Sequence, residues 1–257
     1  LCVVVGKGGA AEKELNRALQ FGLTGNYIQK LLGKSLLLQA RHDDVLTTLS
    51  KMDVDLQVDL LVLRGEAQAG LGKNDLAQAD FQKALLIKPD DSAVLLGQAR
   101  IYLLTGVLQK AVDEVGNVLK SDPGNAEAWV LQGKLANQQE RTVDAQTAYL
   151  RAIELLDANL ITRVGMQARM GLTKLLILQR KFDEATAHVK YLLKASPKKP
   201  ESNYLAGLLE YERKQYAQAR DYFQTVLESA PDHLPSVFLL CSVNYALGNV
   251  EQAEQQL

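Results

Sequence analysis

The chain of 257 residues is poor in the residues that form cross-links or carry chemistry, with two cysteines, three histidines and one tryptophan. Cys2 and Cys241 stand near opposite ends, so an extended molecule could not join them, and they do not report the redox compartment. His42, His188 and His233 have no partner at the spacing of metal ligands. The sequence therefore predicts no catalytic residues, no metal site and no cofactor, and we expect the protein not to be an enzyme.

An excess of one charge and a long apolar run are also missing. The 29 basic residues balance 30 acidic ones, for a net charge of −1, which excludes the basic surface typical of nucleic-acid binding. Hydrophobic residues make up 47% of the chain, enough for a continuous core. No run approaches the roughly 18 apolar residues of a membrane-spanning helix. We expect neither a nucleic-acid partner nor a membrane span in these residues.

What the chain does have is a regular internal period. The clearest unit runs from Val58 to Asp91 and contains two amphipathic segments with helical spacing, Leu60–Leu71 and Asp75–Ile87. A small residue recurs at one place in each unit, and all but one of the steps between its copies are equal. The copies are Ala77, Ala111, Ala145, Ala185, Ala219 and Ala253. The sequence thus predicts repeated pairs of helices.

Glycine inside these helices needs a packing reason, because it costs about 1 kcal/mol relative to alanine. Gly65 occupies such a position, and Gly133 and Gly207 occupy the same one in later units. We expect each glycine to face a small residue of the second helix, which would let the two axes approach to about 8–10 Å.

The pattern resembles the tetratricopeptide repeat, a helix–turn–helix unit of about 34 residues. The resemblance implies an all-α fold, a right-handed superhelical solenoid of about six to seven units that forms one continuous array over residues 1–257. We expect a partial unit at 1–23, a degenerate unit at 24–57, full units at 58–91, 92–125, 126–165, 166–199 and 200–233, and a partial unit at 234–257. Neither end has the polar face of a capping repeat, so we expect a piece of a longer solenoid.

One step in the period is longer than the others. The step from Ala145 to Ala185 exceeds the rest by six, which places six extra residues in 157–165. Six residues correspond to about 1.7 helical turns. They are expected to extend the next helix or to form a loop. The alternative is a local change in superhelical pitch beside a binding site.

The resemblance also implies a binding surface. In tetratricopeptide arrays the first helix of each unit lines the concave side, with its second, fifth, ninth and twelfth positions facing the groove, and the last three of these carry the candidate residues. The corresponding residues are Val62, Glu66, Leu96, Arg100, Val130, Lys134, Met170, Lys174, Tyr204, Tyr211, Phe238 and Tyr245. The middle of the groove is expected to be basic beside an apolar stripe, and its C-terminal part aromatic. This surface suits a protein or peptide segment with acidic residues. The alternative is that the cations are ordinary solvated side chains.

Several segments are also similar to one bacterial family, the tetratricopeptide-repeat lipoproteins of the PEP-CTERM system: Ala11–Leu15, Leu63–Ala67, Ser202–Leu205, Ala230–Ser236 and Tyr245–Glu254. That resemblance implies a scaffold in exopolysaccharide export or exosortase-dependent protein sorting, at the periplasmic face of a Gram-negative membrane. The lipid anchor would lie upstream and would not be Cys2. The alternatives are a cytoplasmic adaptor or regulator, and the repeat portion of a larger enzyme.

Overall fold

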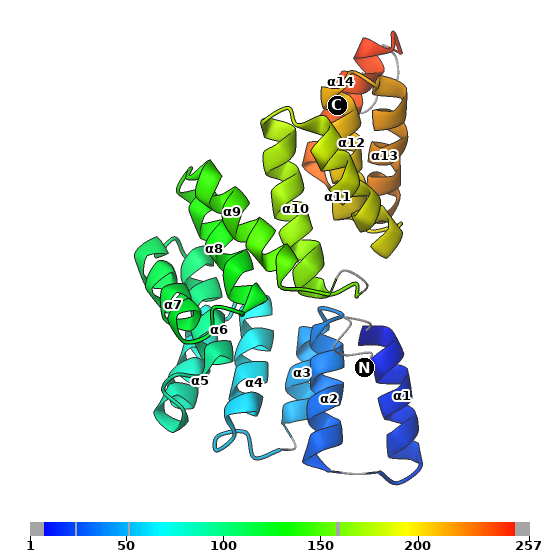
Figure 1. The fold of residues 1–257 in the computed structure, drawn as a ribbon. Coiled ribbons are helices and arrows are strands. Elements are labelled where there is room, and N and C mark those ends of the chain that lie inside the picture. Colours follow the sequence, from blue (N-terminus) through cyan, green and yellow to red (C-terminus); the bar gives the residue numbers. More distant parts are fainter. Residues whose placement is uncertain (1–7, 24, 51, 158–159, 250–257) are drawn as a thin grey trace.

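The computed structural model of the protein describes residues 8–23, 25–50, 52–157 and 160–249. Within these ranges the chain forms fourteen α-helices and no strand, which confirms the all-α prediction (Figure 1). Cys2 and Ala253 lie outside the described residues. The helices are α1 (Gly8–Gln20), α2 (Asn26–Leu37), α3 (His42–Leu49), α4 (Val58–Gly70), α5 (Asn74–Ile87), α6 (Ser92–Leu104), α7 (Leu108–Ser121), α8 (Ala126–Gln138), α9 (Thr142–Glu154), α10 (Arg163–Leu178), α11 (Phe182–Ala195), α12 (Pro200–Glu212), α13 (Tyr216–Ser229) and α14 (Leu234–Ala246).

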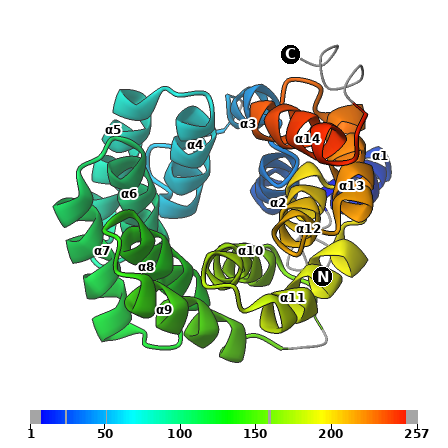
Figure 2. The ribbon, with the colours of Figure 1, turned by 90° about the horizontal axis from the view of Figure 1, so that it is seen from above.

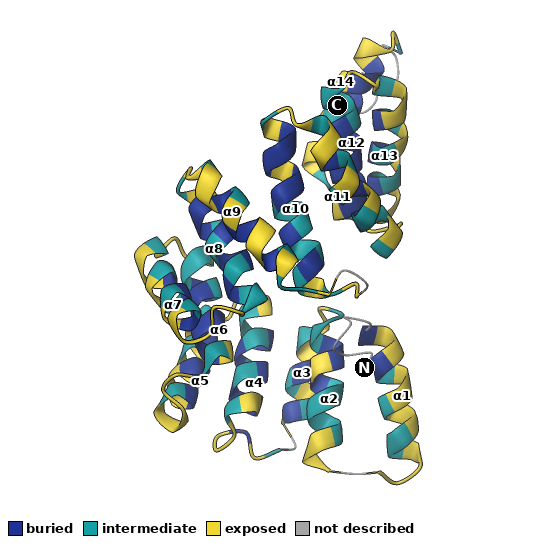
Figure 3. Cartoon of the chain, in the orientation of Figure 1, coloured by how far each residue is buried: buried dark blue, intermediate teal, exposed yellow. Residues whose placement is uncertain are grey.

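The helices form a right-handed superhelix. Each first helix packs on the second helix of its own unit, and consecutive first helices also touch, as α4 does with α6 and α8 with α10. Seen from above, the path climbs counter-clockwise from α1 towards α14, with α4, α8 and α10 on the inner side and α5, α7 and α9 outside (Figure 2). The buried residues follow the faces where helices meet (Figure 3). None of the described helices is long and apolar enough to cross a membrane.

Short polar side chains fix where several first helices begin. The Asp91 carboxylate accepts hydrogen bonds from the amides of Ala93 (3.0 Å) and Val94 (3.3 Å). Asn125 Oδ1 accepts one from the Ala128 amide at 3.0 Å. Such caps satisfy backbone donors that have no partner inside the helix. They hold the starts of α6 and α8 at the same point of the period.

The recurring small residues lie at the crossing of the two helices of a unit. Five of the six are described, and all are fully buried: Ala77, Ala111, Ala145, Ala185 and Ala219. Any larger side chain would push the two helices apart, because protein interiors are close-packed. This burial explains why the period is marked by alanine.

The glycines face aromatic rings, contrary to the expectation that they face small residues. A Cβ atom on Gly65 would lie 2.7 Å from Phe81 Cε1, and one on Gly133 would lie 2.6 Å from Tyr149 Cε1. A Cβ atom on Gly97, in the next unit, would lie 2.6 Å from Phe81 Cζ. The ring of the second helix is therefore wedged between the first helices of two successive units, and glycine leaves the space for it.

The six extra residues are divided between a link and a helix. The link from α9 to α10 spans residues 155–162, whereas the link from α5 to α6 spans only 88–91. Helix α10 has 16 residues, against 13 in α8 and α12. It begins at Arg163, where Thr162 Oγ1 accepts a hydrogen bond from the Gly165 amide at 3.0 Å. The insertion thus adds almost one turn to the start of α10.

Candidate functional site

Part of the apolar stripe expected along the groove is buried. Leu96 and Val130 are only 2% and 1% exposed, so neither can contact a ligand, and the prediction for these two residues is wrong. Val130 packs with Ala152 of α9 and Ala168 of α10. The fifth position of these first helices therefore faces the seam between units. Along this track, Val62 and Met170 remain partly exposed.

Arg100 is not a free cation, contrary to its predicted role. Its guanidinium donates to Glu66 Oε1 on α4 at 2.8 Å and to Glu127 Oε1 on α8 at 2.7 Å. Arg163 of α10 donates to the same Glu127 oxygen at 2.8 Å. Burial acts to lower the pKa of Arg100, but the two carboxylates outweigh it and the pKa is raised. These four side chains, here called the charge ladder, tie together the first helices of four successive units.

Lys134 and Lys174 are two groove cations without a partner. In the part of the chain that the structure describes, neither makes a hydrogen bond or an ion pair. Both line a cavity of about 510 Å³ between α8, α9 and α10, together with Asn137, Gln138, Tyr149, Gln167, Met170 and Gly171. Burial, followed by the nearby charges of Arg100, Arg163 and Lys174, lowers the pKa of Lys134. An anion in this cavity would relieve that unfavourable environment.

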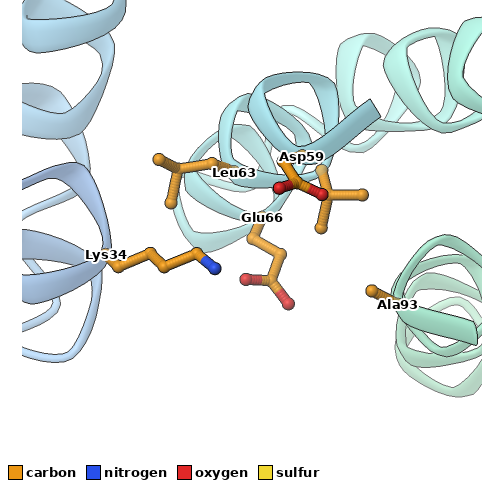
Figure 4. A pocket seen from close by; sticks show the side chains of 6 residues that line it. Lys34, Asp59, Leu63, Glu66 and Ala93 are labelled. Atoms are coloured by element: carbon orange, nitrogen blue, oxygen red, sulfur yellow. The ribbon is translucent and has the colours of Figure 1, made fainter. Parts of the chain in front are cut away.

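The groove near the N-terminal helices is closer to charge balance. A cavity of about 90 Å³ there is lined by Lys34, Asp59, Val62, Leu63, Glu66 and Ala93. Figure 4 shows Lys34 of α2 and Glu66 of α4 pointing toward one another. Asp59 is paired with Lys30, and Glu66 with Arg100. This part of the groove offers a smaller recess, with its acidic side chains already engaged.

The four aromatic residues expected in the C-terminal part of the groove differ in how much of each side chain is exposed. Tyr204 packs against Phe223 with ring centroids 6.2 Å apart, and Tyr211 packs edge-on against another tyrosine at 5.8 Å. Phe238 and Tyr245 of α14 are 63% and 72% exposed. These two side chains are the ones available to a partner.

Three residues of the site were missing from the sequence-based set. Glu127 stands at the second position of a first helix, a position that the fifth, ninth and twelfth tracks leave out. Gln167 stands at the same second position on α10 and lines the cavity, whereas Arg163 lies in the extra turn that the insertion adds before it. A trace of the second positions would have found both Glu127 and Gln167. No repeat position marks Arg163. Among the described residues no cluster of His, Cys, Asp and Glu could hold a metal ion.

The charge ladder predicts a loss of stability in acid. Burial acts to raise the pKa of Glu127, but Arg100 and Arg163 outweigh it and the pKa is lowered. Its stabilising effect is therefore present above its unfolded-state pKa of about 4.3 and is lost as the pH falls through the lower folded-state pKa. At pH 7 we expect Glu127→Gln to cost about 1 kcal/mol. Urea titrations at pH 7, 5, 4 and 3 should show the difference from wild type shrinking, and a constant difference would contradict the assignment.

Comparison with known proteins agrees with the helical pairs. A family model described as "Tetratricopeptide repeat" matches residues 68–135. A model of the anaphase-promoting complex, cyclosome, subunit 3 matches residues 178–257. Each model covers less than a third of the chain, and the two lie in different parts of the array.

Curated relatives are longer than this chain. It is 28% identical over 204 residues to mouse tetratricopeptide repeat protein 34, covering 70% of this chain and 36% of the relative. It is 25% identical over 183 residues to the bovine BBSome complex member BBS4, covering 71% of this chain and 34% of the relative. The chain thus spans about a third of the length of these relatives.

A solved structure supports the fold over nearly the whole chain. The APC/C hetero-tetramer Cut9–Hcn1 superposes with a TM-score of 0.77 at 14% identity, covering 94% of this chain and 47% of that one. Identity this low shows the fold alone. The paired helices, the right-handed superhelix and the superposition together show that the chain has the fold of a tetratricopeptide-repeat solenoid, and the repeat model matches part of it.

Proposed function

We propose that the array is a non-catalytic scaffold that binds an acidic segment of a partner protein along the inner face of α8 and α10. One observation carries the proposal. Lys134 and Lys174 line the same cavity without an ion pair among the described residues, while the neighbouring Arg100 and Arg163 are already paired. Lys174 is exposed but Lys134 is half-buried, and burial of an unpaired charge is unfavourable, so a carboxylate beside Lys134 gains more there than on an open surface.

The rest of the cavity suits an extended polypeptide. Asn137, Gln138 and Gln167 offer side-chain amides, which can donate to and accept from a peptide backbone. Met170 adds an adaptable apolar contact. Further along the inner face, Phe238 and Tyr245 are exposed aromatic side chains of the kind that anchors interfaces. The segment would therefore place acidic residues over α8–α10 and apolar residues towards α14.

Charge reversal of the two lysines tests the proposal. A fluorescein-labelled extended peptide rich in glutamate and leucine is titrated with the protein at 0.1 M salt. The double variant Lys134→Glu, Lys174→Glu should bind about 100-fold more weakly, equivalent to roughly 2.7 kcal/mol. Wild-type affinity should also fall as salt shortens the screening length from about 10 Å at 0.1 M to about 3 Å at 1 M.

The matched control is Lys190→Glu, Lys194→Glu, which reverses two exposed lysines of α11 that do not line the cavity. It changes the net charge by the same amount and should leave the affinity within about threefold of wild type, since distant exposed charges are largely screened. If both double variants weaken binding equally, or if neither weakens it, Lys134 and Lys174 are ordinary solvated side chains and the proposal fails.

The cellular setting is a separate part of the proposal. The similarity of several segments to PEP-CTERM-system lipoproteins supports a role at the periplasmic face of a Gram-negative membrane, in polysaccharide export or protein sorting. The BBSome relative, named as a complex member, supports an adaptor in a protein assembly instead. Fractionation of the natural full-length protein, with detection of a bound lipid, separates the two. A lipid-free protein in the cytoplasmic fraction would favour the adaptor.

A further inference from the structure

The six-residue insertion places a residue in the binding groove. Arg163 lies in the extra turn at the start of α10, beyond the helix start expected from the period. Its guanidinium lies 2.8 Å from Glu127 Oε1 on α8. Counted back from α12, the 34-residue period alone would begin this helix at Met166, three residues after Arg163. The insertion that breaks the repeat therefore also supplies the Arg163 charge that lies beside Glu127.

Arg163 binds the Glu127 carboxylate, which is the acidic group of α8 that could otherwise pair with Lys134. Glu127 and Lys134 lie seven residues apart on α8, so both side chains fall on the same face of that helix. Arg100 and Arg163 both donate to Glu127 Oε1, at 2.7 and 2.8 Å. Held between two guanidinium groups, this carboxylate makes no ion pair with Lys134. The lysine stays available beside the cavity.

We infer that Arg163 is a positioning residue: by holding Glu127 away from Lys134 it keeps the groove open to acidic segments, and the insertion is the specificity element of the array. The inference rests on the proposed function, because it concerns the same site. A strictly periodic array would carry Glu127 as a built-in competitor for the lysine. The insertion removes that competition by lengthening the start of α10, while the cavity-lining residues of α8 keep their places in the repeat.

The same labelled glutamate–leucine peptide tests this role in the full chain. Arg163→Ala should release Glu127 towards Lys134 and weaken peptide binding about tenfold. Adding Glu127→Gln should restore the affinity to within about threefold of wild type, because an amide cannot compete as an anion. Glu127→Gln alone should bind at least as tightly as wild type. The matched control is Arg151→Ala, which removes a half-exposed arginine of α9 paired with Glu154 at 3.1 Å and should change nothing.

The outcomes separate this inference from the proposed function. If reversal of Lys134 and Lys174 leaves peptide binding unchanged, the proposed function fails and the inference falls with it. If the lysines matter but Arg163→Ala binds like wild type, only the inference is overturned. The inference is also overturned if Arg163→Ala binds the peptide weakly and the added Glu127→Gln substitution does not restore the affinity. Circular dichroism of each variant checks the helices, and Glu127→Gln alone still tests the competition if Arg163→Ala unfolds.

Discussion

Replacing Asp80 with alanine should destabilise the protein by about 3 kcal/mol, near the lower end of the range for breaking a buried ion pair. Asp80 of α5 is 4% exposed and accepts two hydrogen bonds from Arg64 of α4, at 2.7 Å to Nε and 2.6 Å to Nη2. This paired geometry holds the two helices of one unit together. Its loss would leave a guanidinium that is only 25% exposed without its main partner.

Asp55 provides the control, because it pairs with the same arginine from an exposed position. It lies 2.8 Å from Arg64 Nη2 and its side chain is 58% exposed. Asp55→Ala should therefore cost much less than Asp80→Ala, because water screens an exposed ion pair. Urea denaturation followed by circular dichroism measures both variants. Similar losses for the two would mean that burial of the Asp80 pair contributes little.

Replacing Gly133 with leucine should strongly destabilise the array. Even a Cβ atom at this position would lie 2.6 Å from the Tyr149 ring, which is 3% exposed and cannot move into solvent. Overpacking of this kind costs about 1–3 kcal/mol, and here the upper end or more is expected. A thermal melt should show a drop of roughly 2–4 °C for each kcal/mol.

Gly116 gives the opposite expectation in the same assay. It lies inside α7, and a Cβ atom there would meet no atom within 4 Å. Gly116→Leu should raise the stability by up to about 1 kcal/mol, because glycine is a poor helix former. An unchanged melting temperature for Gly133→Leu would show that the glycine–ring contact is not needed for the helices to cross.

The sequence by itself determined the class of the protein and the phase of its helices. Ala77, Ala145 and Ala219 mark the crossings of three units, because only a small side chain allows two helices to approach closely, and that requirement recurs at every period. The residue that packs against Gly65 could not be predicted from the period. The glycine left a space, and only the packing showed that Phe81 fills it from one unit to the next.

The binding groove depended on the tertiary structure. Repeat position alone predicted Lys134 and Lys174 as free cations and Arg100 as a third. The last was wrong, because a partner 27 residues along the chain, Glu127, is brought within 2.7 Å by the stacking of α6 on α8. Superhelical packing also buries Val130 at the seam between two units. Periodicity fixes which face a side chain occupies, whereas burial and charge pairing depend on what the neighbouring helices place against that face.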